Sequence, residues 1–131
     1  MMSVGDILKA IYDDKSLCIF NTIALARDYD SDILITNINL SRKQFYARMS
    51  KLIGTGLISR LSGRYHLTSL GKIVYYAQNL IGNAVKDYWK LKALDSLHVS
   101  KSQIPAEEHN RIIDAIIDNQ KIKEVVLVRR V

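Results

Sequence analysis

The sequence predicts a mainly α-helical protein that contains one small β-hairpin, an α+β arrangement. Apolar residues recur at helical spacing along most of the 131 residues. Near the middle, this spacing gives way to two short apolar runs on either side of Ser62 and Gly63, a pattern typical of a hairpin. With 48% hydrophobic and 24% charged residues, the composition is that of a globular chain that can bury a core.

The N-terminal part is expected to be helical. Residues 4–14 and 15–29 each carry an apolar stripe at helical spacing, and the sequence leaves open whether residues 13–16 separate two helices. Residues 28–32 are rich in Asp and Ser, which is typical of a turn. Residues 33–40 fit either a strand or a short helix. We favour the helix, because a well-marked helix follows closely.

The helix predicted over residues 41–54 has the clearest signals. Ser41 is a good N-cap residue, and Gln44 three positions later completes a capping-box pattern. Gly54 and Gly56 mark its end, since either can adopt the left-handed conformation common at helix C-termini. The apolar stripe of this helix contains Phe45, Met49, Leu52 and Ile53. The opposite face presents Lys43, Gln44, Ala47, Ser50 and Lys51, with Tyr46 and Arg48 on the flanks.

Residues 57–68 form the predicted hairpin, which carries Arg60 and Arg64 near its tip. A helical pattern follows from about residue 70 to residue 97, a length of roughly 40 Å at about 1.5 Å per residue. Its apolar residues alternate three and four positions apart, as in a coiled coil. The region before it is too small to cover so long a helix. We therefore expect its far end to pair with a second copy of the chain, through Ile81, Ala84, Tyr88 and Leu91.

The C-terminal part contains a further helical pattern and an ambiguous end. Pro105 stands where this helix would begin, with two glutamates in the first turn. Residues 121–131 are rich in β-branched side chains and fit a strand or an extension of the helix. The helix that begins near Pro105 would have a buried face formed by Ile112, Ile113, Ile116 and Ile117. We expect two regions, residues 1–69 and residues 70–131, of which the second serves dimerisation.

The charges are distributed unevenly. The net charge is +6, yet no Asp or Glu occurs between Asp32 and Asp87. The basic residues in this stretch are Arg42, Lys43, Arg48, Lys51, Arg60, Arg64, Lys72 and Lys86. A solvated surface is the ordinary explanation of a charge run, but an acid-free stretch of this length favours an anionic partner.

The order of these elements is that of a winged helix-turn-helix: helix, short helix, helix with a basic outer face, and hairpin with a basic tip. The segments "LSRKQFYARMSKL", "GLI" and "RYHLTSLGK" resemble the winged-helix DNA-binding domains of archaeal transcriptional regulators. The resemblance covers roughly residues 17–80. It implies a winged helix-turn-helix fold and a regulator of transcription that binds double-stranded DNA. It names neither the operator nor the sign of regulation.

In such a protein, residues 41–54 would enter a major groove and residues 57–68 would lie along the backbone or in the minor groove. We expect Lys43, Gln44 and Ala47 to contact bases, and Arg42, Arg48 and Lys51 to hold phosphates. Arg60 and Arg64 would act through the hairpin. Tyr46 fits either a DNA contact or packing on the preceding helix. A homodimer of this kind would bind a roughly palindromic site.

Other functions have little support in the sequence. Cys18 lies in an apolar helical stretch and is expected to be a buried small side chain. His66, His98 and His109 lack ligand spacing, so we expect neither a metal site nor a cofactor, and no pattern indicates an enzyme. We expect neither a secretory signal nor a membrane-spanning segment, and therefore a cytoplasmic protein. A small-molecule effector is neither indicated nor excluded. The alternative function is a winged-helix protein-interaction module in a larger transcription or signalling assembly.

Overall fold

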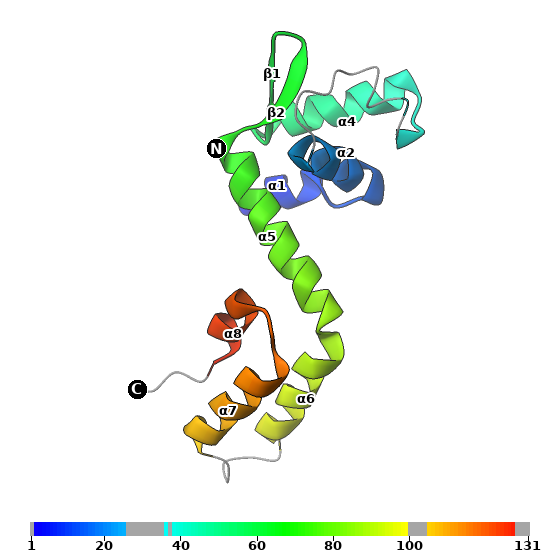
Figure 1. The fold of residues 1–131 in the computed structure, drawn as a ribbon. Helices are drawn as coiled ribbons and strands as arrows, with labels where there is room; N and C mark the ends of the chain where they lie inside the picture. The colour runs from blue at the N-terminus through cyan, green and yellow to red at the C-terminus, as the bar shows by residue number, and fades with distance from the viewer. Residues whose placement is uncertain (1, 26–35, 37, 100–104, 128–131) are drawn as a thin grey trace. The chain divides into compact units, whose positions relative to one another are not determined.

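The computed structural model describes residues 2–25, 36, 38–99 and 105–127 (Figure 1). The described residues form a mainly helical fold with one two-stranded antiparallel hairpin. The chain divides into two compact units, which are residues 1–76 (unit 1) and residues 77–131 (unit 2). The elements are α1 Val4–Ala10, α2 Asp14–Leu25, α4 Arg42–Gly54, β1 Ile58–Leu61, β2 Arg64–Leu67, α5 Ser69–Lys86, α6 Tyr88–Val99, α7 Ala106–Ile116 and α8 Gln120–Val126.

The N-terminal segment forms two helices rather than one. Ser3 caps α1, in a capping box that Asp6 completes. At the start of α2, Oδ1 of Asp13 accepts a 2.8 Å hydrogen bond from the N–H of Ser16. A side-chain acceptor at this position satisfies a backbone donor that has no partner within the helix, and so favours a new helix start there. The polar cluster at residues 28–32 lies outside the described residues.

The predicted capping box of α4 is confirmed. Oγ of Ser41 accepts from the N–H of Gln44, and Oε1 of Gln44 accepts from the N–H of Ser41. Three residues of the expected apolar stripe are buried, namely Phe45, Met49 and Leu52. Ile53 is exposed instead, contrary to the prediction, because it lies about 100° around the helix from Leu52, at the edge of the stripe. Just before α4, Thr36 and Ile38 are helical, and Leu40 is buried.

The hairpin is formed as predicted. Arg60 pairs with Tyr65 and Leu61 with Arg64 across the two strands. Ser62 and Gly63 connect them with φ angles of 53° and 78°. Two consecutive positive φ angles define a type I′ turn, whose twist matches that of the two strands that it joins.

The core of unit 1 contains side chains from every element of the unit. α5 begins with Thr68 as its cap, whose Oγ1 accepts from the N–H of Gly71 at 2.9 Å. Gly71 lies directly against the backbone of Leu57, so that a Cβ at this position would be 2.1 Å from the Leu57 carbonyl oxygen. The core residues are Ala10, Ile19, Phe20, Ile23, Leu40, Phe45, Met49, Leu52, Leu57, Ile58 and Tyr65, with Leu70 and Val74 packed against them.

The long helix predicted over residues 70–97 is two helices. α5 ends at Lys86 and α6 begins at Tyr88, with a turn at Asp87. The N–H of Asp87 is shared between the carbonyls of Asn83 and Ala84, at 3.1 Å each. The hydrogen bond to Ala84 is of the 3₁₀ type, three residues back along the chain, and tightens the helix locally. Figure 1 shows a bend at this point.

Unit 2 has a separate core, formed by Leu94, Ile113, Ile117 and Ile122. Pro105 precedes α7, as predicted. The strand considered for residues 121–131 is wrong for the part described: residues 121–126 belong to α8, and Leu127 is its C-cap. Oδ1 of Asn119 caps this helix by accepting from the N–H groups of Lys121 and Ile122. α8 is therefore a separate helix and does not continue α7.

Candidate nucleic-acid interface

The outward face of α4 is basic and neutral in the structure. Most of the residues expected to contact DNA are exposed on α4: Arg42, Lys43, Gln44, Tyr46, Ala47 and Lys51. Arg60 and Arg64 are exposed on the hairpin. In Figure 1, β1 and β2 lie beside α4, and α4 contacts β1. Unit 1 therefore brings the two predicted DNA-contacting elements together.

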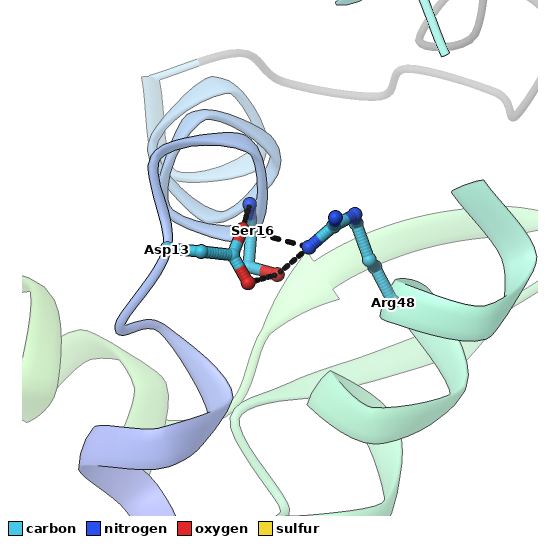
Figure 2. A network of polar contacts seen from close by, with 3 residues as sticks. All are labelled: Asp13, Ser16 and Arg48. Carbon is cyan, nitrogen blue, oxygen red and sulfur yellow. Dashed lines mark hydrogen bonds and ion pairs between the residues drawn. The ribbon is translucent and has the colours of Figure 1, made fainter. Parts of the chain in front are cut away.

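Arg48 lies differently from the other cations. Its Nη1 donates a 2.7 Å hydrogen bond to Oδ1 of Asp13 and a 3.0 Å bond to Oγ of Ser16 (Figure 2). Oγ of Ser16 in turn donates to Oδ2 of Asp13 at 3.1 Å. The guanidinium thus joins α4 to the start of α2, and it compensates the carboxylate that lies nearest to it. A phosphate contact by Arg48 would have to compete with this network.

The network changes the acidity of Asp13. Partial burial acts to raise the pKa of its carboxyl group, but the hydrogen bond from the Ser16 N–H and those from Arg48 and the Ser16 hydroxyl act the other way. The positive charge of Arg48 adds to them, and the pKa lies below its ordinary value of 3.8. Asp13 is therefore ionised and paired with a cation at neutral pH.

Gln44 is exposed, but its side chain also forms part of the capping box of α4. Its Oε1 lies 3.2 Å from the backbone N of Ser41, in the capping box. Reading adenine with both ends of the amide group requires this oxygen and the amide nitrogen together. Base contact by Gln44 would therefore require the side chain to leave the cap. The capping box does not involve Lys43 or Ala47, whose side chains are exposed on the same helix.

An aromatic cluster connects the hairpin to α4. The rings of Phe45 and Tyr65 are 6.4 Å apart, and Tyr46 lies edge-on to Phe45 at 5.3 Å. The guanidinium of Arg60 lies 5.5 Å from the centroid of the Tyr65 ring, a cation–π distance. Burial raises the pKa of Tyr65, which the charge of Arg60 partly offsets, so the hydroxyl stays protonated. The cluster positions Arg60 relative to α4. Tyr46 is part of this cluster, because it packs on Phe45, and it is also exposed.

At the C-terminal end of α4, an acidic side chain of α1 lies near Lys51. Lys51 borders a shallow hollow that is also lined by Asp6 and Lys9 of α1. The carboxylate of Asp6 accepts a hydrogen bond from the Ser3 backbone, which lowers its pKa and keeps it charged. Lys51 thus shares its surroundings with the Asp6 carboxylate, which offsets part of its positive charge.

Two residues that organise this surface, Asp13 and Tyr65, were not predicted from the sequence to do so. Asp13 is the partner of Arg48 across 35 positions of the chain. Tyr65 appeared only as an apolar strand residue, yet it contacts both Arg60 and Phe45. For Tyr65 a signal existed, because Arg60 and Tyr65 are opposite one another in any hairpin that turns at Ser62 and Gly63. No pattern in a single sequence indicates the contact of Asp13 with Arg48.

The residues expected to form a dimer do not share one surface. Ala84 and Leu91 pack against the core of unit 2 in their own chain. Ile81 and Tyr88 are exposed. The bend at Asp87 changes the direction of the helix between these residues, so the regular spacing in the sequence does not produce a continuous seam.

The described residues offer no other obvious chemistry. They contain no group of three or more His, Cys, Asp and Glu residues that could hold a metal ion. Cys18 is exposed on α2, so the expectation that it is buried is wrong, because the core face of α2 passes through Ile19, Phe20 and Ile23. Among the helices that the structure describes, none combines the length and apolar character required to span a bilayer.

Comparison with known proteins identifies no family. No protein-family model matches the sequence, and no curated protein or solved structure shows a significant similarity to the chain. The function must therefore be inferred from the surface of unit 1 itself.

Proposed function

We propose that the protein binds double-stranded DNA sequence-specifically through a winged helix-turn-helix in unit 1, and that it regulates transcription. In this proposal α4 is the recognition helix and the β1–β2 hairpin is the wing. The observation that supports it most directly is the exposure of Arg42, Lys43, Arg60 and Arg64 on two adjacent elements. The sequence between Asp32 and Asp87 adds no carboxylate to these elements.

The phosphates of DNA determine what a binding surface must provide. A DNA duplex carries about one negative charge per 1.7 Å of its length, so a binding surface needs several cations and few acids. A major groove about 12 Å wide admits one α-helix. α4 has an exposed face for such a groove, and it is stabilised by its capping box and by the buried residues on the other side. The hairpin beside it extends the basic surface towards the flanking backbone.

Duplex DNA is favoured over single-stranded nucleic acid by the aromatic residues of α4 and of the hairpin. Single strands are bound by stacking bases on exposed aromatic rings. Here Phe45 and Tyr65 are buried, and Tyr46, which is 41% exposed, packs edge-on against Phe45. The surface therefore offers cations and hydrogen-bonding groups rather than a stacking platform.

The proposal is tested by selecting bound fragments from random duplex DNA and then titrating the selected site at several salt concentrations. We expect one enriched sequence, and an affinity that falls on the order of a thousandfold between 50 and 200 mM salt, as six to ten phosphate contacts require. No enrichment together with a flat salt dependence would refute the proposal.

Charge-reversal substitutions test which surface of the protein binds DNA. We expect Lys43→Glu and Arg64→Glu each to weaken binding at least about tenfold. Arg111→Glu is the matched control, because it makes the same change of charge on an exposed residue of α7 in unit 2. Equal effects of all three substitutions would indicate non-specific attraction by net charge. Unchanged DNA binding by Lys43→Glu and Arg64→Glu, with loss of a protein partner, would favour the protein-interaction module instead.

A further inference from the structure

Unit 2 exposes a group of large apolar side chains on α5 and α6. Ile81, Val85, Tyr88 and Trp89 are 62%, 69%, 48% and 77% exposed. Ile81 and Val85 lie one turn apart on α5. At the start of α6, the rings of Tyr88 and Trp89 lie 5.1 Å apart in an edge-to-face arrangement. Such a cluster on a protein surface is typical of an interaction site, whereas single exposed apolar residues need no explanation.

A hollow adjoins this cluster. It has a volume of about 480 Å³ and lies between α6 and α7, which pack side by side. Trp89, Lys90 and Ala93 line one side, and Ala115, Ile116 and Asp118 line the other. The small side chains of Ala93 and Ala115 leave the space open. A hollow of this size is within the range that accommodates a small molecule, so one aromatic side chain fits.

We propose that a second copy of this chain occupies the hollow, and that Trp89 of each copy enters the hollow of the other. Trp89 lines the hollow in its own chain and is 77% exposed. A two-fold axis beside it would therefore place each indole ring against Ala93 and Ala115 of the partner. In a two-fold interface the same patch serves both copies, so a projection and a hollow that adjoin one another are the complementary features that it requires.

The charges at the rim fit the same arrangement. Lys90 and Asp118 both line the hollow, and they have opposite charges. A two-fold axis would bring Lys90 of each copy towards Asp118 of the other. Within each chain, the ammonium group of Lys92 lies 5.5 Å from the centroid of Tyr88 and 6.0 Å from that of Trp89. These cation–π contacts restrict the two rings before association, which lowers the entropy lost on binding.

The exposed area is sufficient for a specific dimer. Fully buried aromatic side chains cover roughly 150–250 Å² each, so two partly exposed aromatic residues and two aliphatic ones present on the order of 500 Å² per copy. Both copies together would bury roughly 1,000 Å², about the lower bound for specific interfaces. This surface replaces the seam expected from the sequence, because Ala84 and Leu91 are already used in the core of unit 2.

The dimer does not depend on DNA binding, because every residue that forms it belongs to unit 2. Its consequence for DNA does rest on the proposed function: two copies of α4 would read a site with two-fold symmetry. The two proposals can therefore fail separately, and the experiments below measure association in the absence of DNA.

The first test is sedimentation equilibrium of the full chain. We expect the wild type to form dimers that dissociate on dilution, and Trp89→Ser and Ala115→Arg to remain monomeric. Ala115 is exposed, so its replacement fills the hollow without disturbing the core of unit 2. Val125→Ser is the control, since Val125 is 74% exposed on α8 and outside the cluster. A wild type that stays monomeric up to about 100 μM, or a Trp89→Ser variant that still dimerises, would overturn the proposal.

The second test uses fluorescence, because Trp89 is the single tryptophan of the chain. At high concentration we expect a blue-shifted emission that is protected from acrylamide, and dilution should shift the emission to the red and remove the protection. Ala115→Arg should show the diluted spectrum at all concentrations while keeping the helical circular dichroism of the wild type. A dimer whose Trp89 remains fully accessible to acrylamide would mean that another surface mediates association, and the proposal would be wrong.

Discussion

Nη1 of Arg48 lies 2.7 Å from Oδ1 of Asp13, and this ion pair joins the outer helix α4 to the start of α2. Both side chains are about three-tenths exposed, at 29% and 30%. The same carboxylate caps α2 through the N–H of Ser16. One acidic residue thus starts a helix and also fixes a cation on the flank of the proposed recognition helix.

Replacing Asp13 by Asn should separate these two tasks. Asparagine is as good an N-cap as aspartate, so the start of α2 is preserved while the charge is lost. We expect the free energy of unfolding at pH 7 to fall by about 1 kcal/mol, as for a partly exposed ion pair. Urea denaturation measures this change. Asp14→Asn is the control, because Asp14 is exposed and takes no part in the pair; an equal loss there would show that Arg48 does not stabilise the fold through Asp13.

The acidity of Asp13 predicts how stability depends on pH. Its pKa is lower in the folded protein than the ordinary value of 3.8, so the unfolded chain binds the proton more tightly. The stabilisation is complete above that ordinary pKa and is lost as the pH falls through the lower folded pKa. Urea denaturation from pH 7 down to about pH 3 should therefore show a smaller decline for Asp13→Asn than for the wild type. Identical pH profiles would contradict the lowered pKa.

Gln44→Glu should separate stability from DNA binding. Glutamate completes a capping box as well as glutamine does, and its charge is favourable in the first turn of a helix. We expect the melting temperature to be unchanged or slightly raised. The substitution also adds a negative charge to the exposed side of α4, which would repel the phosphates of bound DNA, so we expect DNA affinity to fall at least about tenfold. Gln44→Ala is the companion variant: it weakens the cap but adds no charge, so it should lower stability more than it lowers DNA affinity. Full DNA binding by Gln44→Glu would argue against α4 as the recognition helix.

The features predicted correctly from the sequence are local ones. The capping box of Ser41 and Gln44 spans four positions, and the turn at Ser62 and Gly63 spans two. In both, neighbouring residues supply the hydrogen bonds or the φ angles, so the pattern carries the whole cause. The basic face of α4 follows from helical spacing in the same way.

The features that could not be predicted depend on distant contacts. The partner of Arg48 lies 35 positions away, and nothing in the spacing points to it. The β-branched residues near the C-terminus favour a strand by propensity, but the cap at Asn119 and the burial of Ile122 form a helix there. The apolar spacing of residues 70–97 suggested one continuous partner surface, whereas the chain uses part of it for the core of unit 2.

The turn of the hairpin can be improved. Ser62 has a φ of 53°, a conformation that glycine and asparagine tolerate better than serine. We expect Ser62→Asn to stabilise unit 1 by roughly 0.5 kcal/mol without changing DNA affinity, since it alters neither Arg60 nor Arg64. Gly63→Ala is the converse variant and should destabilise the unit, because the φ of Gly63 is 78°. Hydrogen exchange of the β1–β2 amides would report both changes, and protection that rises in Gly63→Ala would contradict the assigned turn.

Gly71 should be the least replaceable glycine of the chain. A Cβ there would lie 2.1 Å from the carbonyl oxygen of Leu57, and that oxygen accepts a 3.1 Å hydrogen bond from the N–H of Thr68. The backbone cannot move aside without breaking the connection between the hairpin and α5. We therefore expect Gly71→Ala to destabilise unit 1 by roughly 3 kcal/mol.

Two controls have no atom within 4 Å of the added methyl group: Gly82, which lies in the same helix, and Gly54, which lies in unit 1. Because alanine favours a helix over glycine, Gly82→Ala should stabilise by up to about 1 kcal/mol. Thermal unfolding followed by circular dichroism measures all three. A Gly71→Ala variant as stable as the two controls would mean that α5 does not lie against Leu57, and the placement of the hairpin on unit 1 would have to be revised.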